Sequence, residues 1–384
     1  MRYRELGRTG FKVSEIGVGG EWLDRLDLAQ TCQILDYCFD KGINILDCYM
    51  SNPSTRSNIG SAIHDHRNEW LIEGHFGSIW ENGQYKRSRD MNKVRSAFED
   101  LLRRMKTDYI DIGMIHYVDE ISDLNGVFQG EFMEYVQECK QKGLIRAVGM
   151  SSHNPEVAIK AVETGLLDVL LFSVNPAYDI LPPVEDVMQL FEDAVFQDET
   201  LAGIAPERAA LYQLCQRREV GVTVMKGFAG GRLFNEQTSP FGVALTPVQC
   251  IHYALTRPAV SSVMVGFGDI KHVDDAVAYE ISSSDERDYA SVLAQAPRHS
   301  YYGQCTYCGH CAPCAAGIDI AMVNKLLDLA VMQEKMPETV REHYLALEHR
   351  ADECLQCGAC LSRCPFGVKI IHNMQRAKQI FTFA

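Results

Sequence analysis

The sequence predicts an eight-stranded α/β barrel, a TIM barrel, followed by a small and mainly helical domain that binds metal. Before residue 300, short apolar or β-branched runs alternate with longer amphipathic stretches, as repeated βα units around a parallel sheet require. After residue 300, eight of the 14 cysteines fall in two closely spaced runs. We therefore expect a barrel over residues 1–297 and a cysteine-rich domain over residues 298–384.

Eight runs have the composition of buried parallel strands: 14–20, 43–49, 70–76, 110–117, 145–152, 169–175, 221–228 and 262–267. Between them, apolar residues recur three and four apart at 93–105, 131–142 and 207–218, which predicts amphipathic helices. Eight strands in about 300 residues favour a barrel. A doubly wound sheet is the alternative, but no GxGxxG motif follows the first strand, and 17–20 is too short to hold a pyrophosphate.

The C-terminal cysteines have the spacing of iron–sulfur ligands. In two-cluster ferredoxins, three closely spaced thiolates bind one cubane and the fourth cysteine binds the other. We therefore expect two [4Fe-4S] clusters, one on Cys305, Cys308, Cys311 and Cys364 and the other on Cys354, Cys357, Cys360 and Cys314. Zinc is the rival metal, but three equally spaced cysteines in each run exceed what a tetrahedral zinc site needs. Helical patterns at 320–334 and 338–349, between the runs, predict a helical module. The boundary at 297–303 lacks the composition of a linker, so we expect the module to be docked on the barrel.

Composition excludes several classes of function. The net charge of -14 argues against a nucleic-acid partner, because phosphates require clustered Lys and Arg. No apolar run reaches the ~20 residues that a membrane-spanning helix needs, and the N-terminus has no apolar signal region. The six cysteines outside the two runs lie scattered, which does not suggest disulfides. We expect a cytoplasmic protein, and the oxygen sensitivity of exposed clusters indicates an anaerobic cell.

Polar residues at the carboxyl ends of barrel strands are candidates for chemistry, because TIM-barrel active sites lie at that face. They are Asp47, His75, His116, Ser151, Ser152, Asn175 and Lys226. A lone histidine at a strand end is usually a hydrogen-bonded core residue, whereas two on adjacent strands beside an aspartate favour a functional site. The alternative is that Asp47 and His75 form a satisfied polar contact without a catalytic role.

Several segments together resemble a known family. They are YRELGRTGFKVSEIGVGG, GINILDCY, TDYIDIGMIHYVD, GLIRAVGMSSHNPEVA, VMKGFAGGRL, and the cysteine runs CTYCGHCAPCAAGIDI and CLQCGACLSRCP. In this order they resemble the aldo-keto reductases, in the branch with a C-terminal two-cluster ferredoxin domain. The resemblance extends over the whole chain and implies an oxidoreductase.

The resemblance implies an incomplete catalytic tetrad. The family uses an Asp, a Tyr, a Lys and a His, of which Asp47 and His116 match. Asn52 stands at the position of the tyrosine and His75 at that of the lysine, so carbonyl reduction by NADPH along the usual route is doubtful. Tyr49 has the strand parity of Asp47 and is one alternative acid. An imidazolium at His75 or His116 is another.

The family's cofactor residues are also altered. Its Ser-Asn pair after the fifth strand corresponds to Ser151 and Ser152, its glutamine to Leu171, and its adenine-binding asparagine to Ala276. Two glycine turns remain that suit a phosphate of NADP(H) or of a flavin, formed by Gly230, Gly231 and Arg232 and by Gly266, Gly268 and Lys271. The alternative is that these glycines only form tight βα turns.

We expect an oxidoreductase that acts on a small carbonyl-type molecule in the barrel mouth, with electrons relayed by the clusters from a ferredoxin or flavoprotein. The alternatives are a lyase or isomerase that uses His75 and His116, with structural or sensing clusters, and an electron-transfer subunit. Trp22, Trp80 and the region of Tyr85 are expected to cap the mouth, or to lie in a solvated loop. The long acidic segment 176–206 is a candidate lid.

Overall fold

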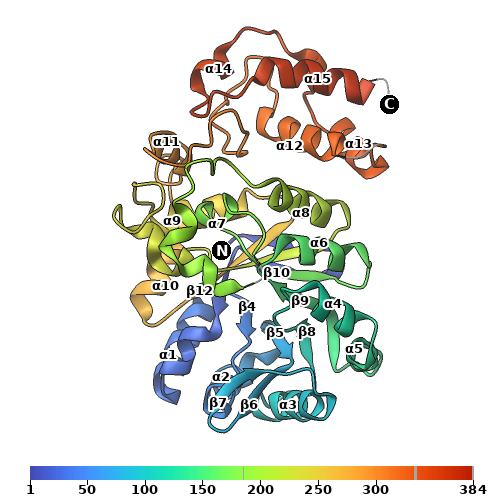
Figure 1. Ribbon diagram of the computed structural model, residues 1–384. Helices are drawn as coiled ribbons and strands as arrows, with labels where there is room; N and C mark the ends of the chain where they lie inside the picture. Colours follow the sequence, from blue (N-terminus) through green and yellow to red (C-terminus); the bar gives the residue numbers. More distant parts are fainter. Residues whose placement is uncertain (185, 333–334, 383–384) are drawn as a thin grey trace.

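The computed structural model describes residues 1–184, 186–332 and 335–382. Eight parallel strands close into a barrel in the order β10-β11-β12-β3-β4-β5-β8-β9 (Figure 1). Their bounds are β3 (Ile16–Gly19), β4 (Ile45–Cys48), β5 (Leu71–Phe76), β8 (Ile110–Ile115), β9 (Ile145–Ser152), β10 (Val169–Ser173), β11 (Gly221–Met225) and β12 (Val260–Gly266). Each strand coincides with one of the eight predicted runs, which confirms the barrel.

The strands are apolar because they are covered on both sides, as in other parallel sheets. Inside the barrel, Ile45, Ile112, Met114 and Leu171 belong to one buried cluster. The same cluster includes residues of a short N-terminal hairpin, β1 (Tyr3–Glu5) and β2 (Lys12–Ser14). The hairpin therefore packs on the barrel interior at the amino ends of the strands, which leaves the carboxyl ends for a site.

Helices cover the outside of the barrel: α1 (Leu28–Asp40), α2 (Pro53–Ala62), α3 (Met91–Arg104), α4 (Ile121–Phe128), α5 (Glu131–Gln141), α6 (Pro155–Glu163), α7 (Pro176–Asp179), α8 (Pro206–Arg217), α9 (Pro247–Leu255), α10 (Ile270–Val277) and α11 (Tyr289–Ala294). The three helices that the periodicity predicts are α3, α5 and α8. In α3, for example, Asp90 caps the first turn while Val94, Phe98 and Leu101 are buried.

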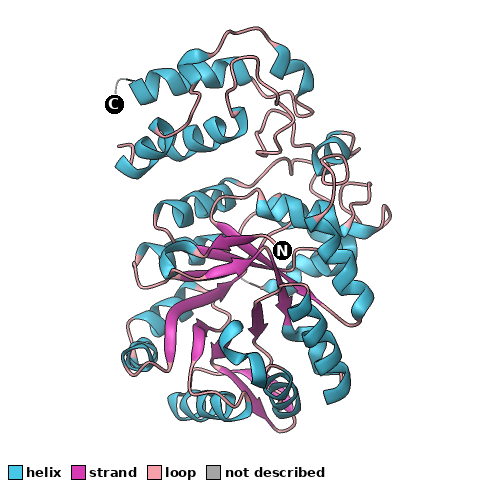
Figure 2. Cartoon of the chain, turned by 180° about the vertical axis from the view of Figure 1, so that it is seen from behind, coloured by secondary structure: helices cyan, strands magenta, loops and turns pink. Residues whose placement is uncertain are grey.

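The C-terminal domain consists of helices and loops, as Figure 2 shows from behind. Its helices are α12 (Ile320–Val331), α13 (Glu338–Leu345), α14 (Ala359–Arg363) and α15 (Ile370–Thr382). The predicted helices at 320–334 and 338–349 correspond to α12 and α13, although residues 333 and 334 lie outside the described part. Within that part, no helix is long and apolar enough to cross a membrane.

The second domain is docked on the barrel beside α8 and α9 (Figure 1). One buried apolar cluster contains residues of both parts, such as Tyr253 of α9 and Leu327 of α12. The backbone N–H of Gly203 donates to the carbonyl of Ser300 at 3.0 Å. A boundary at 297/298 stays a prediction, because packing is continuous across it.

Candidate functional site

Four polar side chains form one hydrogen-bonded chain at the ends of β4, β5 and β8. Asp47 Oδ1 lies 2.7 Å from His75 Nε2, and His75 Nδ1 lies 2.8 Å from His116 Nδ1. His116 Nε2 lies 2.5 Å from the hydroxyl of Tyr85. The sequence predicts that Asp47, His75 and His116 gather in the mouth, and the structure places them in direct contact. We call these four residues the relay.

The chemistry of the end group fixes the direction of the relay. An ionised Asp47 can only accept, so His75 donates through Nε2 and, when neutral, accepts through Nδ1. His116 must then donate through Nδ1, which leaves its Nε2 to accept the hydrogen of Tyr85. The Tyr85 phenol is therefore the terminal proton donor of the relay.

A β-hairpin delivers Tyr85 to the relay. The segment after β5 forms β6 (Ser78–Glu81) and β7 (Gln84–Arg87), where Tyr85 pairs with Trp80. The sequence predicts that this segment is a loop around the mouth, and it does not predict that Tyr85 acts as a proton donor. The sequence does contain a signal for the hairpin: polar and aromatic residues alternate on either side of Asn82-Gly83, a dipeptide typical of hairpin turns.

Tyr49 and Asn52 have other roles in this geometry. The Tyr49 ring stacks on the His116 ring, with centroids 5.7 Å apart and planes 6° apart. Burial, followed by the charges of Glu21 and Asp47, raises the pKa of Tyr49. The side chain of Asn52 accepts from the N–H of Ser54 and caps α2, and its correspondence with the family's tyrosine stays a prediction.

Burial sets the protonation states of the relay. Burial first, then the neighbouring His75 and the Arg89 charge, hold the pKa of His116 well below its usual range. Burial raises the pKa of Tyr85 to about 12. At neutral pH, His116 is therefore a neutral acceptor and Tyr85 keeps its proton.

A buried carboxyl, Glu73, lies next to the relay and was missed from the sequence. It pairs with Asp47 across the β4–β5 ladder, and its Oε1 accepts from Thr223 Oγ1 of β11 at 2.7 Å. Burial and the Asp47 charge raise the pKa of Glu73 well above its usual value. Because β5 and β11 are four strands apart in either direction around the barrel, this hydrogen bond spans its interior.

A second acid–histidine pair follows β8 and β9. Asp119 Oδ2 lies 2.8 Å from His153 Nδ1, while Asp119 Oδ1 accepts from Ser152 Oγ at 2.9 Å and from the N–H of His153 at 2.6 Å. The sequence predicts a role for Ser152 but not for Asp119 or His153. The same strand-end rule could have found them, since Asp119 lies three residues after His116 and His153 follows Ser152 directly.

The other strand-end residues predicted to bind a cofactor already have partners. Ser151 Oγ accepts from the N–H of Tyr117 at 2.8 Å. The Asn175 side chain caps α7 through the N–H of Tyr178 and donates to the carbonyl of Lys226 at 2.9 Å. Lys226 itself lies 5.3 Å from the ring centroid of Phe191, and burial lowers the pKa of its amine. Their assignment to a cofactor stays a prediction.

The first glycine turn lies under part of the predicted lid. Gly230 and Gly231 have φ of 67° and 88°, values that favour glycine. Arg232 forms an ion pair with Asp193 and donates to the carbonyl of Phe191 at 2.7 Å. The short helices η4 (Val187–Phe191) and η5 (Asp193–Phe196) thus cover this turn. Residue 185 of the predicted lid 176–206 is outside the described chain, and the role of a lid stays a prediction.

The second glycine turn is occupied by the chain's own groups. A Cβ on Gly266 would lie 2.3 Å from Trp22 Cδ1, so the glycine allows the indole to approach. The N–H of Gly268 donates to His272 Nδ1 at 3.2 Å, and Asp269 caps α10 by accepting from the N–H of His272. Lys271 forms an ion pair with Asp275. A phosphate would meet an acidic cap at this helix end, so the residues present do not fit the phosphate of a nicotinamide or flavin cofactor.

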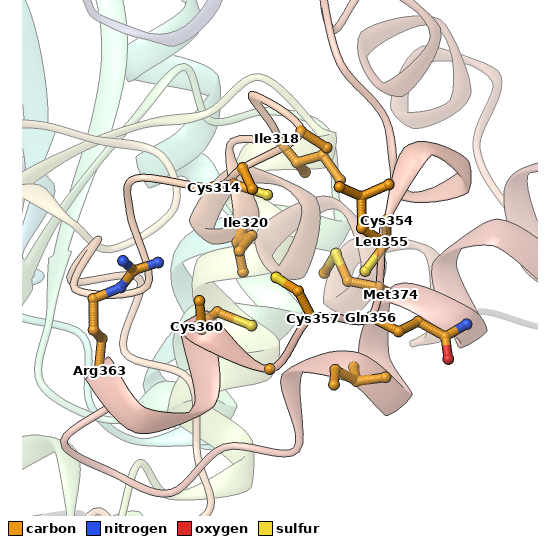
Figure 3. Close-up of a pocket in the computed structure, with 15 residues that line it drawn as sticks. Cys314, Ile318, Ile320, Cys354, Leu355, Gln356, Cys357, Cys360, Arg363 and Met374 are labelled. Atoms are coloured by element: carbon orange, nitrogen blue, oxygen red, sulfur yellow. The ribbon is translucent and has the colours of Figure 1, made fainter.

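The eight cysteines of the second domain surround two pockets in a crossed arrangement. Cys314 lines one pocket with Cys354, Cys357 and Cys360, and its empty volume is about 410 Å³. Figure 3 shows the four sulfurs around this common space. The other pocket, of about 310 Å³, is lined by Cys305, Cys308, Cys311 and Cys364. These are the two ligand sets that the spacing predicts.

The donor sets fit cubane clusters. Each pocket offers four thiols, the ligands that [4Fe-4S] clusters require. In the described chain, no group of three or more His, Cys, Asp or Glu is placed to hold a single metal ion. The sulfurs instead lie around a larger volume, which favours a cluster over zinc. The individual ligand assignments stay predictions.

The pocket of Cys305 and Cys308 is the one beside the barrel. Between these cysteines, the carbonyl of Thr306 accepts from Tyr289 Oη at 2.8 Å and from the guanidinium of Arg257. The Arg257 guanidinium lies 4.5 Å from the ring centroid of Tyr253, whose hydroxyl donates to Asp179 at 2.7 Å. Buried contacts thus lead from the first cysteine run to α7, which follows β10.

Comparisons with known proteins agree with this architecture. Residues 15–247 match the model of the aldo/keto reductase family, and residues 304–369 match a 4Fe-4S dicluster domain. The uncharacterized oxidoreductase YqkF of Bacillus subtilis (strain 168) is 27% identical over 288 residues, which cover 72% of this chain and 90% of the relative. The L-galactose dehydrogenase of Arabidopsis thaliana is 25% identical over 312 residues, which cover 72% of this chain and 88% of that enzyme.

Solved structures show the same fold. The holo form of the aldo-keto reductase AKR11C1 from Bacillus halodurans has a TM-score of 0.59 and 23% identity, and covers 78% of this chain and 98% of its own. A putative aldo-keto reductase from Pseudomonas aeruginosa has a TM-score of 0.55 and 23% identity, and covers 72% and 95% of the two chains. Because the family model spans more than half of the sequence, the chain belongs to the aldo/keto reductase family, as an oxidoreductase with a C-terminal 4Fe-4S dicluster domain.

Proposed function

We propose that this oxidoreductase acts on a small carbonyl-type substrate in the barrel mouth, with electrons relayed by two [4Fe-4S] clusters and a proton supplied by Tyr85. The single observation that carries the proposal is the relay from Asp47 through two histidines to Tyr85. It supplies the proton donor that Asn52 cannot, on a family barrel joined to a dicluster domain.

The relay suits general acid catalysis. Tyr85 donates its proton to the substrate oxygen, which leaves a phenolate, and a proton from solvent restores the phenol after the product leaves. Before the substrate binds, the Tyr85 hydroxyl donates to His116 Nε2, so the two histidines and Asp47 hold the phenol in position until the substrate oxygen takes its hydrogen.

The position of the second domain supports a separate source of electrons. The domain docks beside α8 and α9, the helices on either side of β11, and β11 lies opposite β5 in the barrel. A substrate in the mouth would lie between the β11 side of the barrel and the relay. When bound, the clusters supply single electrons, and two clusters together can hold the two that a carbonyl needs. Reduction of a carbonyl to an alcohol consumes these two electrons and two protons, so the balance requires an external reductant of the ferredoxin or flavoprotein class.

The test uses the reconstituted holoprotein under anaerobic conditions. The clusters are reduced with dithionite, excess reductant is removed, and DL-glyceraldehyde is added while the visible cluster bands are recorded. We expect the bands to return to the oxidised form as the aldehyde is converted to glycerol. In a parallel cuvette NADPH replaces dithionite, and we expect little direct conversion, because Trp22 and Asp269 occupy the second glycine turn.

A matched pair of variants separates the clusters from other thiols. Cys364→Ser removes a predicted ligand of the pocket beside the barrel, whereas Cys32→Ser alters a cysteine of α1 outside both pockets. We expect the first to lose conversion and the second to retain it. Conversion of glyceraldehyde by NADPH at equal rate in the Cys364→Ser protein would overturn the proposal, because hydride would then reach the substrate without the clusters.

A further inference from the structure

The His153 side chain has a buried nitrogen without a partner in the barrel mouth. His153 is 5% exposed, and its Nε2 has no hydrogen-bond partner among the described residues. Buried polar atoms of proteins nearly always have a partner, which can be a ligand or water. The relay does not use this atom, because its two histidines have both ring nitrogens engaged.

Contacts of Asp119 determine what this nitrogen can bind. The carboxylate of Asp119 accepts from Ser152, from the N–H of His153 and from His153 Nδ1, so Nδ1 carries the hydrogen. Burial outweighs the opposing effect of Asp119 and, with the smaller effects of the Lys226 and Arg208 charges, holds the pKa of His153 below its usual value. His153 Nε2 is therefore a fixed acceptor, suited to a hydroxyl or N–H donor and unsuited to an anion.

Three neighbours place this acceptor beside the relay and under the predicted lid. The Tyr117 ring lies between the two histidine sites, with centroids 5.4 Å from His153 and 6.3 Å from His116. The Lys226 charge acts on both Asp119 and His153. Phe191 of η4 packs on Lys226. A molecule that contacts Tyr85 and extends past Tyr117 would reach His153 Nε2.

We propose that the Asp119–His153 pair is a specificity site that accepts a hydrogen bond from a hydroxyl group of the substrate, so that the substrate is a hydroxycarbonyl compound. This inference rests on the proposed function and names its substrate class. The two sites then have different roles: the relay donates a proton to the carbonyl oxygen, and His153 accepts a hydrogen bond from the hydroxyl. A carbonyl compound without a hydroxyl leaves Nε2 buried and unpaired, and sites of that kind reject such analogues strongly.

The test compares two ketones that differ by one hydroxyl, hydroxyacetone and acetone. Their dissociation constants for the oxidised holoprotein are measured by calorimetry without reductant, so a failure of electron transfer cannot affect the result. We expect hydroxyacetone to bind at least about tenfold more tightly than acetone. In His153→Phe the ratio should fall to near one. In His66→Phe, a control at an exposed histidine paired with Glu69, it should be unchanged.

A second measurement does not depend on the folding of a variant. In the unaltered protein labelled with ¹⁵N-histidine, hydroxyacetone should shift the resonance of an unprotonated imidazole nitrogen, and acetone should leave it in place. Equal binding of the two ketones, absence of any binding, a preference that survives in His153→Phe, or an unmoved nitrogen resonance would each overturn the proposal. The first of these would assign the unpaired Nε2 to a bound water.

Discussion

Polar groups on the two sides of the barrel mouth have different kinds of partners. At β4, β5 and β8, hydrogen bonds are donated in one direction, from the Tyr85 hydroxyl through His116 and His75 to Asp47. At the turns after β11 and β12, the groups expected to hold a cofactor phosphate are bound to the chain itself: Arg232 to Asp193, Lys271 to Asp275, and the end of α10 to Asp269. The polar groups of the first side thus form one relay, whereas those of the second side pair with other groups of the chain.

The proposed function relates this difference to the dicluster domain. It assigns the proton to the relay and the electrons to the clusters. The cysteine pockets lie in the domain that docks on the side opposite the relay. If the relay were dispensable, or if NADPH bound tightly, this contrast between the two sides of the mouth would not hold.

The largest effect is expected from Tyr85→Phe, which removes one oxygen from the end of the relay. General acids contribute typically 10²–10⁴-fold, so we expect kcat for glyceraldehyde to fall by about that factor while KM changes little. Single-turnover re-oxidation of prereduced clusters measures kcat without interference from reductant. Tyr109→Phe, which alters a half-buried tyrosine outside the relay that donates to Asn68, is the matched control. A Tyr85→Phe protein as fast as this control would remove the relay from the mechanism.

The dependence of the rate on pH should show that His116 stays neutral. Burial raises the pKa of Tyr85 to about 12, so the acid keeps its proton well into the alkaline range. Burial also holds the pKa of His116 well below its usual range. As pH falls, His116 is therefore protonated, and stops accepting a hydrogen bond from Tyr85, only below the pH range in which exposed histidines titrate. We expect a single-turnover rate that is nearly constant from about pH 7 to about pH 10. A fall of the rate near about pH 6.5 would instead indicate an imidazolium or an exposed histidine.

The sequence was sufficient for the architecture because the fold depends on repeated local signals. Eight β-rich runs and the cysteine spacing each recur, so an error in one element leaves the others intact. The observed ends of helices differ from the predicted ends by a few residues, as for α13, which ends at Leu345 rather than at residue 349. Tertiary packing rather than periodicity sets such ends.

The candidate site was predictable only in part. Asp47, His75 and His116 follow from the strand-end rule because parallel strands bring their carboxyl ends to one face. Tyr85 did not, because it reaches the site through a hairpin whose direction depends on long-range packing. The same limitation applies to Asp269 and Trp22: a glycine turn in a sequence does not reveal which side chains fill it.

The smallest effect concerns the filled turns, and it is tested with Asp269→Gly. Asp269 occupies the end of α10, where a cofactor phosphate would need the same N–H groups and the same positive end of the helix dipole. Glycine is a tolerated N-cap, so the variant should remain folded. Charges at helix ends contribute about 0.3–1 kcal/mol, so removing this one should tighten NADPH binding about two- to fivefold in fluorescence titrations. Asp90→Gly removes the equivalent cap of α3 and should leave NADPH affinity unchanged. If Asp269→Gly also has no effect, this helix end does not face a nucleotide. Tight binding by the unaltered protein would show that Trp22 and Asp269 move aside, and the contrast between the two sides of the mouth would then be a feature of the ligand-free chain alone.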